Sequence, residues 1–219
     1  MARLARSHIM ICGVGAVGGM AAEMMARVGA GRITLLDFDT VNESNINRQI
    51  VALHSTIGKK KIDVMAARIL DINPACIVKT IDEKITEQNV GELLARYKPD
   101  LVLDAIDDVR AKVSLLESCI RGGIPVASSM GAAQRRDLSK IKTGTIGQTK
   151  GCPLARAVRT GLRARNVDIS KTLCVYSDEE IGRDVASARN MAGALPSFAP
   201  MTSTIGIRLA DLAIKLLSA

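Results

Sequence analysis

The most constraining feature of this 219-residue chain is a short apolar segment that runs directly into a glycine-rich loop. Residues 9–12 (Ile-Met-Ile-Cys) predict a buried strand, and Gly13-x-Gly15-x-x-Gly18 follows at once. Glycines at this spacing permit a tight turn and let backbone amides approach a phosphate where the next helix begins. The pattern predicts a βαβ unit that binds a nucleotide, and by itself it fits NAD and ATP equally well.

The first two thirds of the chain alternate apolar, strand-like segments with helix-like segments. This alternation predicts an α/β fold, a Rossmann-like, doubly wound and mainly parallel sheet. The expected strands are 9–12, 33–36, 77–81, 101–104 and 126–129, and the expected helices are 18–28, 59–71, 90–96 and 109–121.

The alternation stops after Met130. Residues 131–172 predict loops and short helices, 172–176 an added strand, 177–200 a mobile loop and 202–217 a helix that packs back on the sheet. A chain of this length can bury one sizeable core. We therefore expect a single domain over 1–219, with a nucleotide-binding core in 1–130 and a basic, substrate-facing extension in 131–219.

Positive charge is concentrated in the last third of the chain. The formal net charge is +8, which either aids solubility or serves a polyanionic partner. The segment 135–171 is poor in acids and holds Arg135, Arg136, Lys140, Lys142, Lys150, Arg156, Arg159, Arg163, Arg165 and Lys171. This clustering favours a nucleic-acid surface, although an aromatic content of 2% argues against base stacking as its main contact.

Several classes of protein are disfavoured by what the sequence lacks. It contains no uncharged apolar run of about 18 residues, so we expect no membrane span, and no signal peptide is apparent. The five cysteines never occur in Cys-x-x-Cys spacing, which argues against a structural zinc site. Reduced thiols and a cytoplasmic location are the natural expectation.

Charged residues after the second and fourth strands distinguish the prediction of ATP binding from that of NAD binding. Asp37 ends the second strand, where a carboxylate holds ribose hydroxyls in either case. Asp39 and the run Asn45-x-Asn47-Arg48-Gln49 then follow in a loop that can fold an arginine over bound phosphates. A dehydrogenase has no use for such an arginine, so the run favours cleavage of ATP.

Two further residues support the same interpretation. Lys61, one turn into the next helix, can act as a point charge on the phosphates, and Asp107 follows the strand 101–104 at the ligand edge of the sheet. A carboxylate there can hold Mg²⁺ against phosphate oxygens. Taken singly, Arg48 and Lys61 could be surface charges and Asp107 a helix N-cap; together they favour an adenylation site.

These motifs resemble the ThiF and MoeB superfamily of adenylating enzymes, which includes the ubiquitin-activating enzymes. The resemblance covers residues 8–130 and rests on the glycine loop, Leu36-Asp37-x-Asp39-x-Val41, Asn45-x-Asn47-Arg48-Gln49, Gly58-x-x-Lys61, Ile72-Asn73-Pro74 and Asp104-Ala105-Ile106-Asp107. It implies that Asp37 contacts the ribose, that Asn45, Arg48 and Lys61 contact the phosphates, and that Asp107 carries magnesium. The implied product is an acyl adenylate, with pyrophosphate released.

Later segments resemble one branch of the superfamily, the ATP-dependent tRNA threonylcarbamoyladenosine dehydratases. The shared residues are Asp107-x-Val109-Arg110-x-Lys112, Pro153-Leu154-Ala155 and Cys174-Val175-Tyr176-Ser177-x-Glu179. This branch cyclises threonylcarbamoyladenosine beside the tRNA anticodon. The resemblance implies tRNA as a partner and a homodimer as the assembly.

Two alternatives stay open at this point. One is activation of a ubiquitin-like sulfur-carrier protein, whose signs are a partner ending in Gly-Gly and a zinc site. The other is a non-catalytic ATP-binding scaffold for sulfur relay, which recruits a cysteine desulfurase. Cys174 could accept an acyl group in the first case, but a small apolar residue on a strand is the simpler interpretation.

Overall fold

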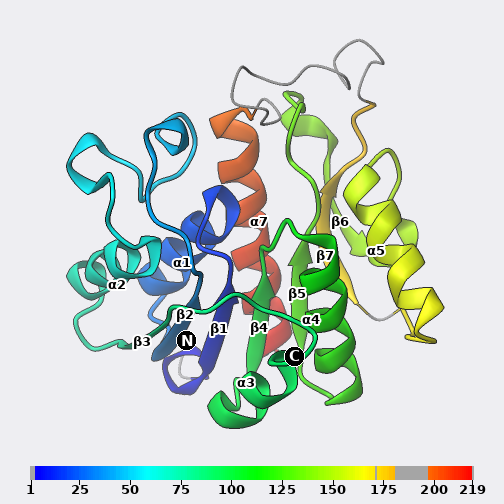
Figure 1. Cartoon of the computed structure of the whole chain (residues 1–219), viewed down its shortest axis with the longest axis horizontal. Helices are drawn as coiled ribbons and strands as arrows, with labels where there is room; N and C mark the ends of the chain where they lie inside the picture. Colours follow the sequence, from blue (N-terminus) through cyan, green and yellow to red (C-terminus); the bar gives the residue numbers. More distant parts are fainter. Residues whose placement is uncertain (1–2, 171, 181–196, 219) are drawn as a thin grey trace.

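The protein is built on one seven-stranded sheet with helices on both faces (Figure 1). The computed structural model describes residues 3–170, 172–180 and 197–218. The strands lie in the order β3-β2-β1-β4-β5-β7-β6, and all neighbours are parallel except β6 and β7. Their bounds are β1 (His8–Cys12), β2 (Arg32–Leu36), β3 (Ile77–Ile81), β4 (Leu101–Asp104), β5 (Val126–Ser129), β6 (Ile141–Thr145) and β7 (Leu173–Ser177).

Six α-helices of the described residues form two layers. One layer holds α1 (Ala16–Arg27), α2 (Lys61–Ile72) and α7 (Ala199–Ser218); the other holds α3 (Val90–Tyr97), α4 (Val109–Arg121) and α5 (Pro153–Ala164). Short 3-10 helices are η1 (Leu4–Arg6), η2 (Glu43–Asn45), η3 (His54–Thr56), η4 (Leu138–Lys140) and η5 (Ile146–Gln148). Ile9 and Ile11 of β1 face the first layer and Met10 and Cys12 the second, so every residue of this strand is apolar except His8 at its start.

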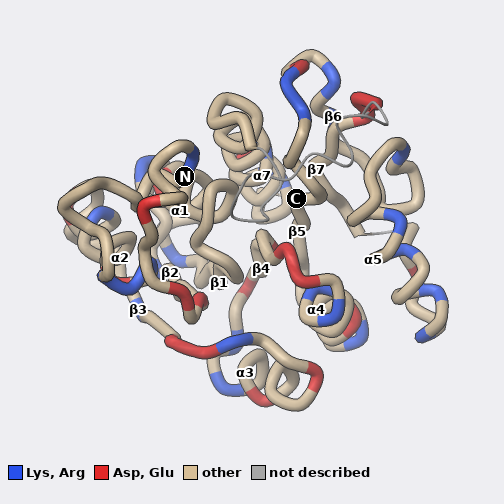
Figure 2. Tube along the Cα trace, turned by 45° about the horizontal axis from the view of Figure 1, so that its top comes forward, with Lys and Arg blue, Asp and Glu red and all other residues tan. Residues whose placement is uncertain are grey.

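The chain reverses its direction of travel across the sheet beside β1. From β1 it moves outward to β2 and β3, and it then returns to place β4 on the other side of β1. Open α/β sheets bind ligands outside the carboxyl ends of the strands at such a switch point. Figure 2 brings this edge forward and shows acidic segments following both β2 and β4, the strands that flank β1.

The predicted sheet is confirmed, and three of its strands and one helix have the expected bounds. One expectation was incomplete. Residues 131–172 contain the strand β6 and the twelve-residue helix α5 besides the expected loops and short helices, here η4 and η5. The strand was missed because β6 lies at the edge of the sheet, pairs only with β7 and is half exposed, so its sequence Ile-Lys-Thr-Gly-Thr carries no apolar run.

Other boundaries differ by a few residues. The helix expected at 59–71 begins at Lys61, because Lys60 is held in a β-bridge with Thr40. The C-terminal helix begins at Ala199, within the expected mobile loop 177–200, and residues 181–196 of that loop lie outside the described residues.

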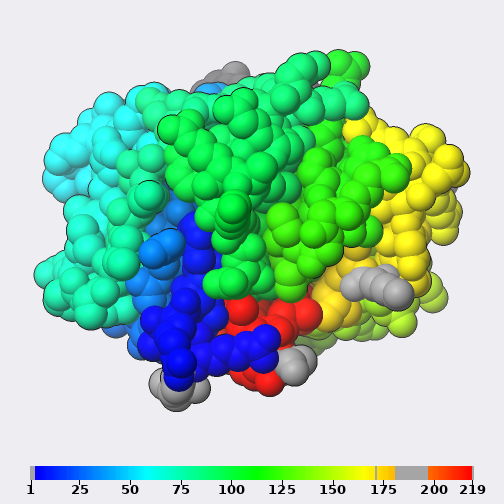
Figure 3. All heavy atoms as spheres, turned by 90° about the horizontal axis from the view of Figure 1, so that it is seen from below, coloured from blue at the N-terminus to red at the C-terminus, as the bar shows by residue number. Residues whose placement is uncertain are grey.

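The first described residues and the end of α7 lie close together on the underside of the molecule (Figure 3). Arg3, Arg6, Leu216 and Leu217 line one hollow there. Among the described residues, no helix has both the length and the apolar character needed to cross a membrane.

Candidate functional site

The glycine loop lies between β1 and α1 and is shaped by close backbone contacts. Gly13 has φ +87°, and a Cβ on it would lie 2.8 Å from the carbonyl oxygen of Ala105. A Cβ on Gly18 would lie 1.8 Å from the carbonyl oxygen of Gly13. Neither position can accept a side chain without movement of the backbone, so the loop needs glycine for its own geometry.

Gly15 has a different environment. It is the N-cap of α1 and provides no side-chain cap. Apart from its chain neighbours, the only described atom within 4 Å of a Cβ built on it is the Gln49 side-chain nitrogen, at 3.7 Å. The chain therefore leaves space beside Gly15 at the start of α1, where the first N–H groups of a helix can bind an anion.

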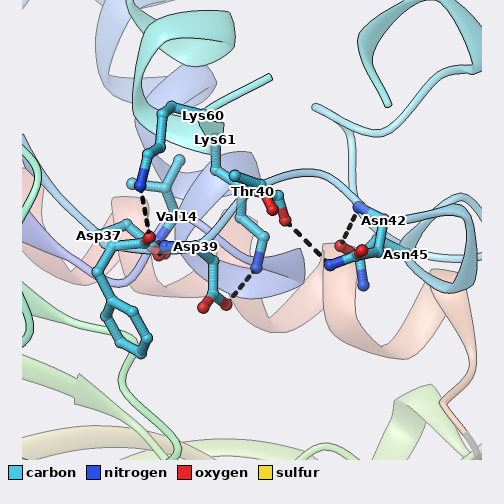
Figure 4. A network of polar contacts seen from close by, with 9 residues as sticks. Val14, Asp37, Asp39, Thr40, Asn42, Asn45, Lys60 and Lys61 are labelled. Atoms are coloured by element: carbon cyan, nitrogen blue, oxygen red, sulfur yellow. Dashed lines mark hydrogen bonds and ion pairs between the residues drawn. The ribbon is translucent and has the colours of Figure 1, made fainter. Parts of the chain in front are cut away.

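Asp37 joins the end of β2 to the glycine loop. Its carboxylate is buried and accepts hydrogen bonds from the backbone amides of Val14 (2.6 Å) and Asp39 (2.8 Å), one on each oxygen. The residue expected to hold the ribose thus also fixes the turn that precedes α1 (Figure 4).

Asp39 and Lys61 form an ion pair at the same edge. Lys61 Nζ lies 2.7 Å from Asp39 Oδ2, and the Lys61 amide donates to the Asp39 carbonyl at 3.1 Å. The lysine side chain is 6% exposed and the aspartate side chain 47% exposed. Figure 4 shows the pair beside Asp37, so these two predicted residues lie together.

The Asn-x-Asn-Arg-Gln run forms a loop built around η2. Asn45 is buried and its side-chain oxygen accepts a hydrogen bond from the Asn42 amide at 3.1 Å. Arg48 is half buried and donates to the Ser44 carbonyl (2.9 Å) and the Asn47 side chain (2.8 Å). Both bonds are made by Nη1, so the guanidinium is held by its own loop through one of its three nitrogens.

Asp107 lies in the turn between β4 and α4. Its carboxylate is exposed and has no hydrogen-bond or ion-pair partner among the described residues. The N-cap of α4 is Asp108, whose side chain accepts from the Ala111 amide at 2.9 Å, so Asp107 does not have the structural role that was its alternative. A free carboxylate beside the glycine loop remains available to a cation.

A buried network behind Asp107 was not assigned a function from the sequence. Lys112 Nζ lies 2.7 Å from Asp104 Oδ2, and both side chains are fully buried. Ser128 Oγ donates to the same oxygen at 2.6 Å. Asp104 and Lys112 belong to the motif that carries the resemblance, but only the fold shows that they meet.

Gln49 belongs to the predicted motif, but no role of its own was assigned to it from the sequence. It is buried, and its side-chain oxygen has no hydrogen-bond partner in the described part of the chain. Its amide nitrogen points toward Gly15. An unpaired buried oxygen next to the glycine loop marks a polar position that a ligand or water can satisfy.

The basic residues of 135–171 divide into two groups. In the first group, Arg135 is 2% exposed and donates to the carbonyls of Gly131, Ala133 and Gly151. Lys142 pairs with Asp178, and Arg159 donates to the Thr149 carbonyl at 2.9 Å. Arg165 contacts Glu117 and holds the pKa of that carboxyl below its usual range. The exposed group, part of it on α5, is Arg136, Lys140, Lys150, Arg156 and Arg163, and Lys171 lies outside the described residues (Figure 2).

All five cysteines are free and buried. Burial raises the pKa of the Cys174 thiol to about 12, even though Lys112 acts in the opposite direction. The thiol is therefore protonated near neutral pH and inside the sheet, which favours the apolar interpretation over the nucleophilic one.

Comparison with known proteins gives the site its context. A family model described as the ThiF family matches residues 1–219. A tRNA threonylcarbamoyladenosine dehydratase of Bacillus subtilis is 40% identical over 197 residues, which cover 85% of this chain and 77% of that protein. The Escherichia coli protein of that name is 41% identical over 160 residues, covering 73% of this chain and 59% of that protein.

Solved structures agree with these matches. The crystal structure of E. coli TcdA, a tRNA N6-threonylcarbamoyladenosine dehydratase, in complex with ATP has a TM-score of 0.89 and 34% identity. The match covers 98% of this chain and 87% of the E. coli chain. E. coli MccB with ATP, at a TM-score of 0.66 and 19% identity, shares the fold. The switch-point glycine loop, the family model and these relatives together show that the chain belongs to the ThiF family.

Proposed function

We propose that this protein is an ATP-dependent tRNA threonylcarbamoyladenosine dehydratase. The observation that carries the proposal is the edge of the sheet at which Asp37 binds the glycine loop and Asp39 pairs with Lys61, in a chain that resembles TcdA over nearly all its length. The named relatives support the substrate, and the edge of the sheet supports the first chemical step.

In that step the threonyl carboxylate of the modified adenosine attacks the α-phosphorus of ATP. The bond to pyrophosphate breaks, and an acyl adenylate forms. The N–H groups at the start of α1 bind phosphate oxygens, and Lys61 leaves Asp39 to neutralise charge on the departing pyrophosphate. The carbamoyl group then attacks the activated carbonyl and displaces AMP, so the nucleoside loses one water overall.

Magnesium fits this site as a cofactor held largely by the phosphates. In the described part of the chain, no group of three or more His, Cys, Asp or Glu side chains could form a metal cage. Mg²⁺ commonly takes one or two carboxylates and completes its shell with phosphate oxygens and water. Asp107 would supply the carboxylate, and the ion would screen negative charge as pyrophosphate leaves.

The remaining assignments belong to the same proposal. The exposed residues Arg136, Lys140, Lys150, Arg156 and Arg163 would contact the tRNA phosphate backbone, so that residues 131–219 serve the substrate and 1–130 the nucleotide. Arg48 would contact the phosphates through its guanidinium. By resemblance we expect a homodimer, work in the cytoplasm where tRNA is modified, and a sulfur-relay partner such as a cysteine desulfurase.

The test uses ATP, magnesium and threonylcarbamoyl-modified tRNA, followed by mass analysis of the nucleosides. We expect the modified adenosine to lose one water, and Asp107→Asn to abolish that loss. Asp108→Asn is the matched control, because the neighbouring side chain keeps its acceptor for the Ala111 amide. It should retain activity within a few-fold.

Other outcomes identify the alternatives. Pyrophosphate release that depends on a carrier protein ending in Gly-Gly would identify that protein, and not tRNA, as the substrate. This alternative is supported by the molybdopterin-synthase adenylyltransferases, which match 60–62% of this chain at 33–34% identity. ATP binding without pyrophosphate release under either condition would favour the non-catalytic scaffold.

A further inference from the structure

The ion pair between Asp104 and Lys112 is enclosed by the protein and hydrogen-bonded to other buried groups. Asp104 Oδ2 accepts from Lys112 Nζ at 2.7 Å and from Ser128 Oγ at 2.6 Å, and Lys112 Nζ lies 3.3 Å from Ser128 Oγ. Both charged side chains are 0% exposed. Removing two charges from water is costly, and well-packed apolar residues often stabilise a core as well or better. Stability alone therefore gives a weak account of this pair.

The pair closes a loop around the turn that bears Asp107. Asp104 Oδ1 accepts from the Ile106 amide at 3.1 Å, and the Ala105 amide donates to the Cys12 carbonyl at 2.8 Å. The turn ends at Asp108, whose carbonyl accepts from the Lys112 amide at 3.0 Å. The Lys112 side chain then returns to Asp104, so both ends of the turn are tied to one buried point.

The same turn is pressed against the glycine loop. The Ala105 carbonyl oxygen lies within 2.8 Å of where a Cβ on Gly13 would be, and the Ala105 Cβ within 3.1 Å of a Cβ on Gly18. Any shift of residues 105–108 would therefore change the distance between Asp107 and the phosphate loop. Asp107 itself makes no bond in the described part of the chain that could hold it in place.

We propose that Lys112, acting through Asp104, is a positioning residue that fixes the 105–108 turn and thereby the distance between the Asp107 carboxylate and the glycine loop. The assignment rests on the proposed function in one respect, the use of Asp107 for the metal that accompanies ATP. Residues that orient metal ligands from behind typically change metal affinity or activity by about 10- to 100-fold when mutated.

The test compares Lys112→Met with Arg68→Met. Arg68 pairs with the buried Glu23 between α1 and α2, so its loss also weakens an ion pair of a buried carboxylate, away from the 105–108 turn. Three quantities are measured: exchange of the Ile106 amide in metal-free protein, the Kd for Mn²⁺ of the complex with a non-hydrolysable ATP analogue, and the Kd for that analogue in EDTA.

We expect Lys112→Met to speed Ile106 exchange by about tenfold or more and to raise the Mn²⁺ Kd by about 10- to 100-fold. Analogue binding in EDTA should stay within about twofold, because the glycine loop and Asp37 are untouched. Arg68→Met should lower the melting temperature and leave all three quantities unchanged. A merely structural role of Lys112 would shift metal-free and metal-dependent binding together.

Two milder variants cover the case in which Lys112→Met does not fold. Ser128→Ala should move Ile106 exchange and Mn²⁺ affinity in the same direction by a smaller factor. The pair Asp104→Asn with Lys112→Met removes both charges, keeps an acceptor for the Ile106 amide and should restore its protection. Unchanged Ile106 exchange and Mn²⁺ affinity in Ser128→Ala, or equal effects of Lys112→Met and Arg68→Met, would overturn the proposal. Ile106 exchange needs neither ATP nor tRNA, so a failure of the wild-type protein to bind Mn²⁺ or modify tRNA counts against the proposed function alone.

Discussion

Two aspartate–lysine ion pairs follow the strands that flank β1, and in both the Nζ–Oδ2 distance is 2.7 Å. They differ in the access of the carboxylate to water: the Asp39 side chain is 47% exposed although Lys61 is 6% exposed, whereas Asp104 and Lys112 are both 0% exposed. In the first pair the lysine can exchange its carboxylate for a phosphate at small cost, because water solvates the Asp39 that it leaves. In the second, separation would leave a charge in the core. The Asp39–Lys61 pair is therefore suited to exchanging partners with a phosphate, and the buried Asp104–Lys112 pair to holding the backbone in place.

The largest expected effect of this difference is on stability. Lys112→Met leaves Asp104 buried and unpaired, which should lower the free energy of unfolding by about 3–5 kcal/mol. Lys61→Met leaves Asp39 in contact with water and should cost about 1 kcal/mol or less. Urea unfolding followed by circular dichroism measures both values. Equal losses would mean that exposure does not separate the two pairs.

The second effect is on catalysis. Here loss of the Asp39–Lys61 pair should matter more than loss of the Asp104–Lys112 pair, which is the reverse of their order in stability. Lys61→Met should reduce the rate of pyrophosphate release by about 10²–10³-fold, as expected for loss of a group that stabilises developing charge. Lys60→Met is the matched control, since Lys60 contacts the Phe38 carbonyl and Asp82 and its side chain is 37% exposed. Similar rates for the two variants would remove Lys61 from the phosphate site.

The sequence predicts those parts of the site that depend on position along the chain. The positions of the glycine loop and Asp37 were predictable because each directly follows a buried strand, and the carboxyl ends of parallel strands meet at one edge. Asp107 was placed at that edge for the same reason. Distinguishing it from an N-cap needed the structure, because Asp108 is adjacent and only a hydrogen bond to the Ala111 amide decides between them.

Contacts that depend on how elements pack could not be predicted. Asp104 and Lys112 are separated by a strand end, a turn and the first turn of a helix, and no periodicity brings them together. Arg48 was expected over the phosphates, but whether its guanidinium binds its own loop depends on the fold of residues 44–47. β6 escaped for a related reason, because an exposed edge strand depends on its partner more than on its own sequence.

His8, a buried ionisable group with no ion pair among the described residues, extends the comparison to a smaller effect. His8 is buried at the start of β1, and its ring is hydrogen-bonded to the Thr34 hydroxyl at 2.8 Å. Burial, with the nearby charge of Arg32, lowers the pKa of His8 below its ordinary value of 6.5. The folded protein therefore favours the neutral ring, and the unfolded chain binds the extra proton.

This sign fixes the pH dependence. The contribution of His8 to stability is fully present above about pH 6.5 and is lost as the pH falls through its lowered folded pKa. One full pKa unit is worth about 1.4 kcal/mol, so the effect is modest. Urea unfolding of the wild type and His8→Gln between about pH 7 and 5.5 measures it. The wild type should lose more stability than the variant over this range, and a wild type that gains stability on acidification would contradict the assignment.

The smallest effect concerns the thiols that share the core with the buried pair. Burial raises the pKa of Cys174 and of Cys119 to about 12, and at Cys174 it outweighs the opposing charge of Lys112. The native protein should therefore react negligibly with a thiol reagent near neutral pH, and all five cysteines should react after denaturation. Cys174→Ala should keep the dehydration rate within about twofold, since the carbamoyl group closes the ring without an enzyme thiol. Rapid labelling of Cys174 in the native protein, together with loss of activity in Cys174→Ala, would show that the thiol is accessible to solvent and would contradict its assignment as a buried apolar residue.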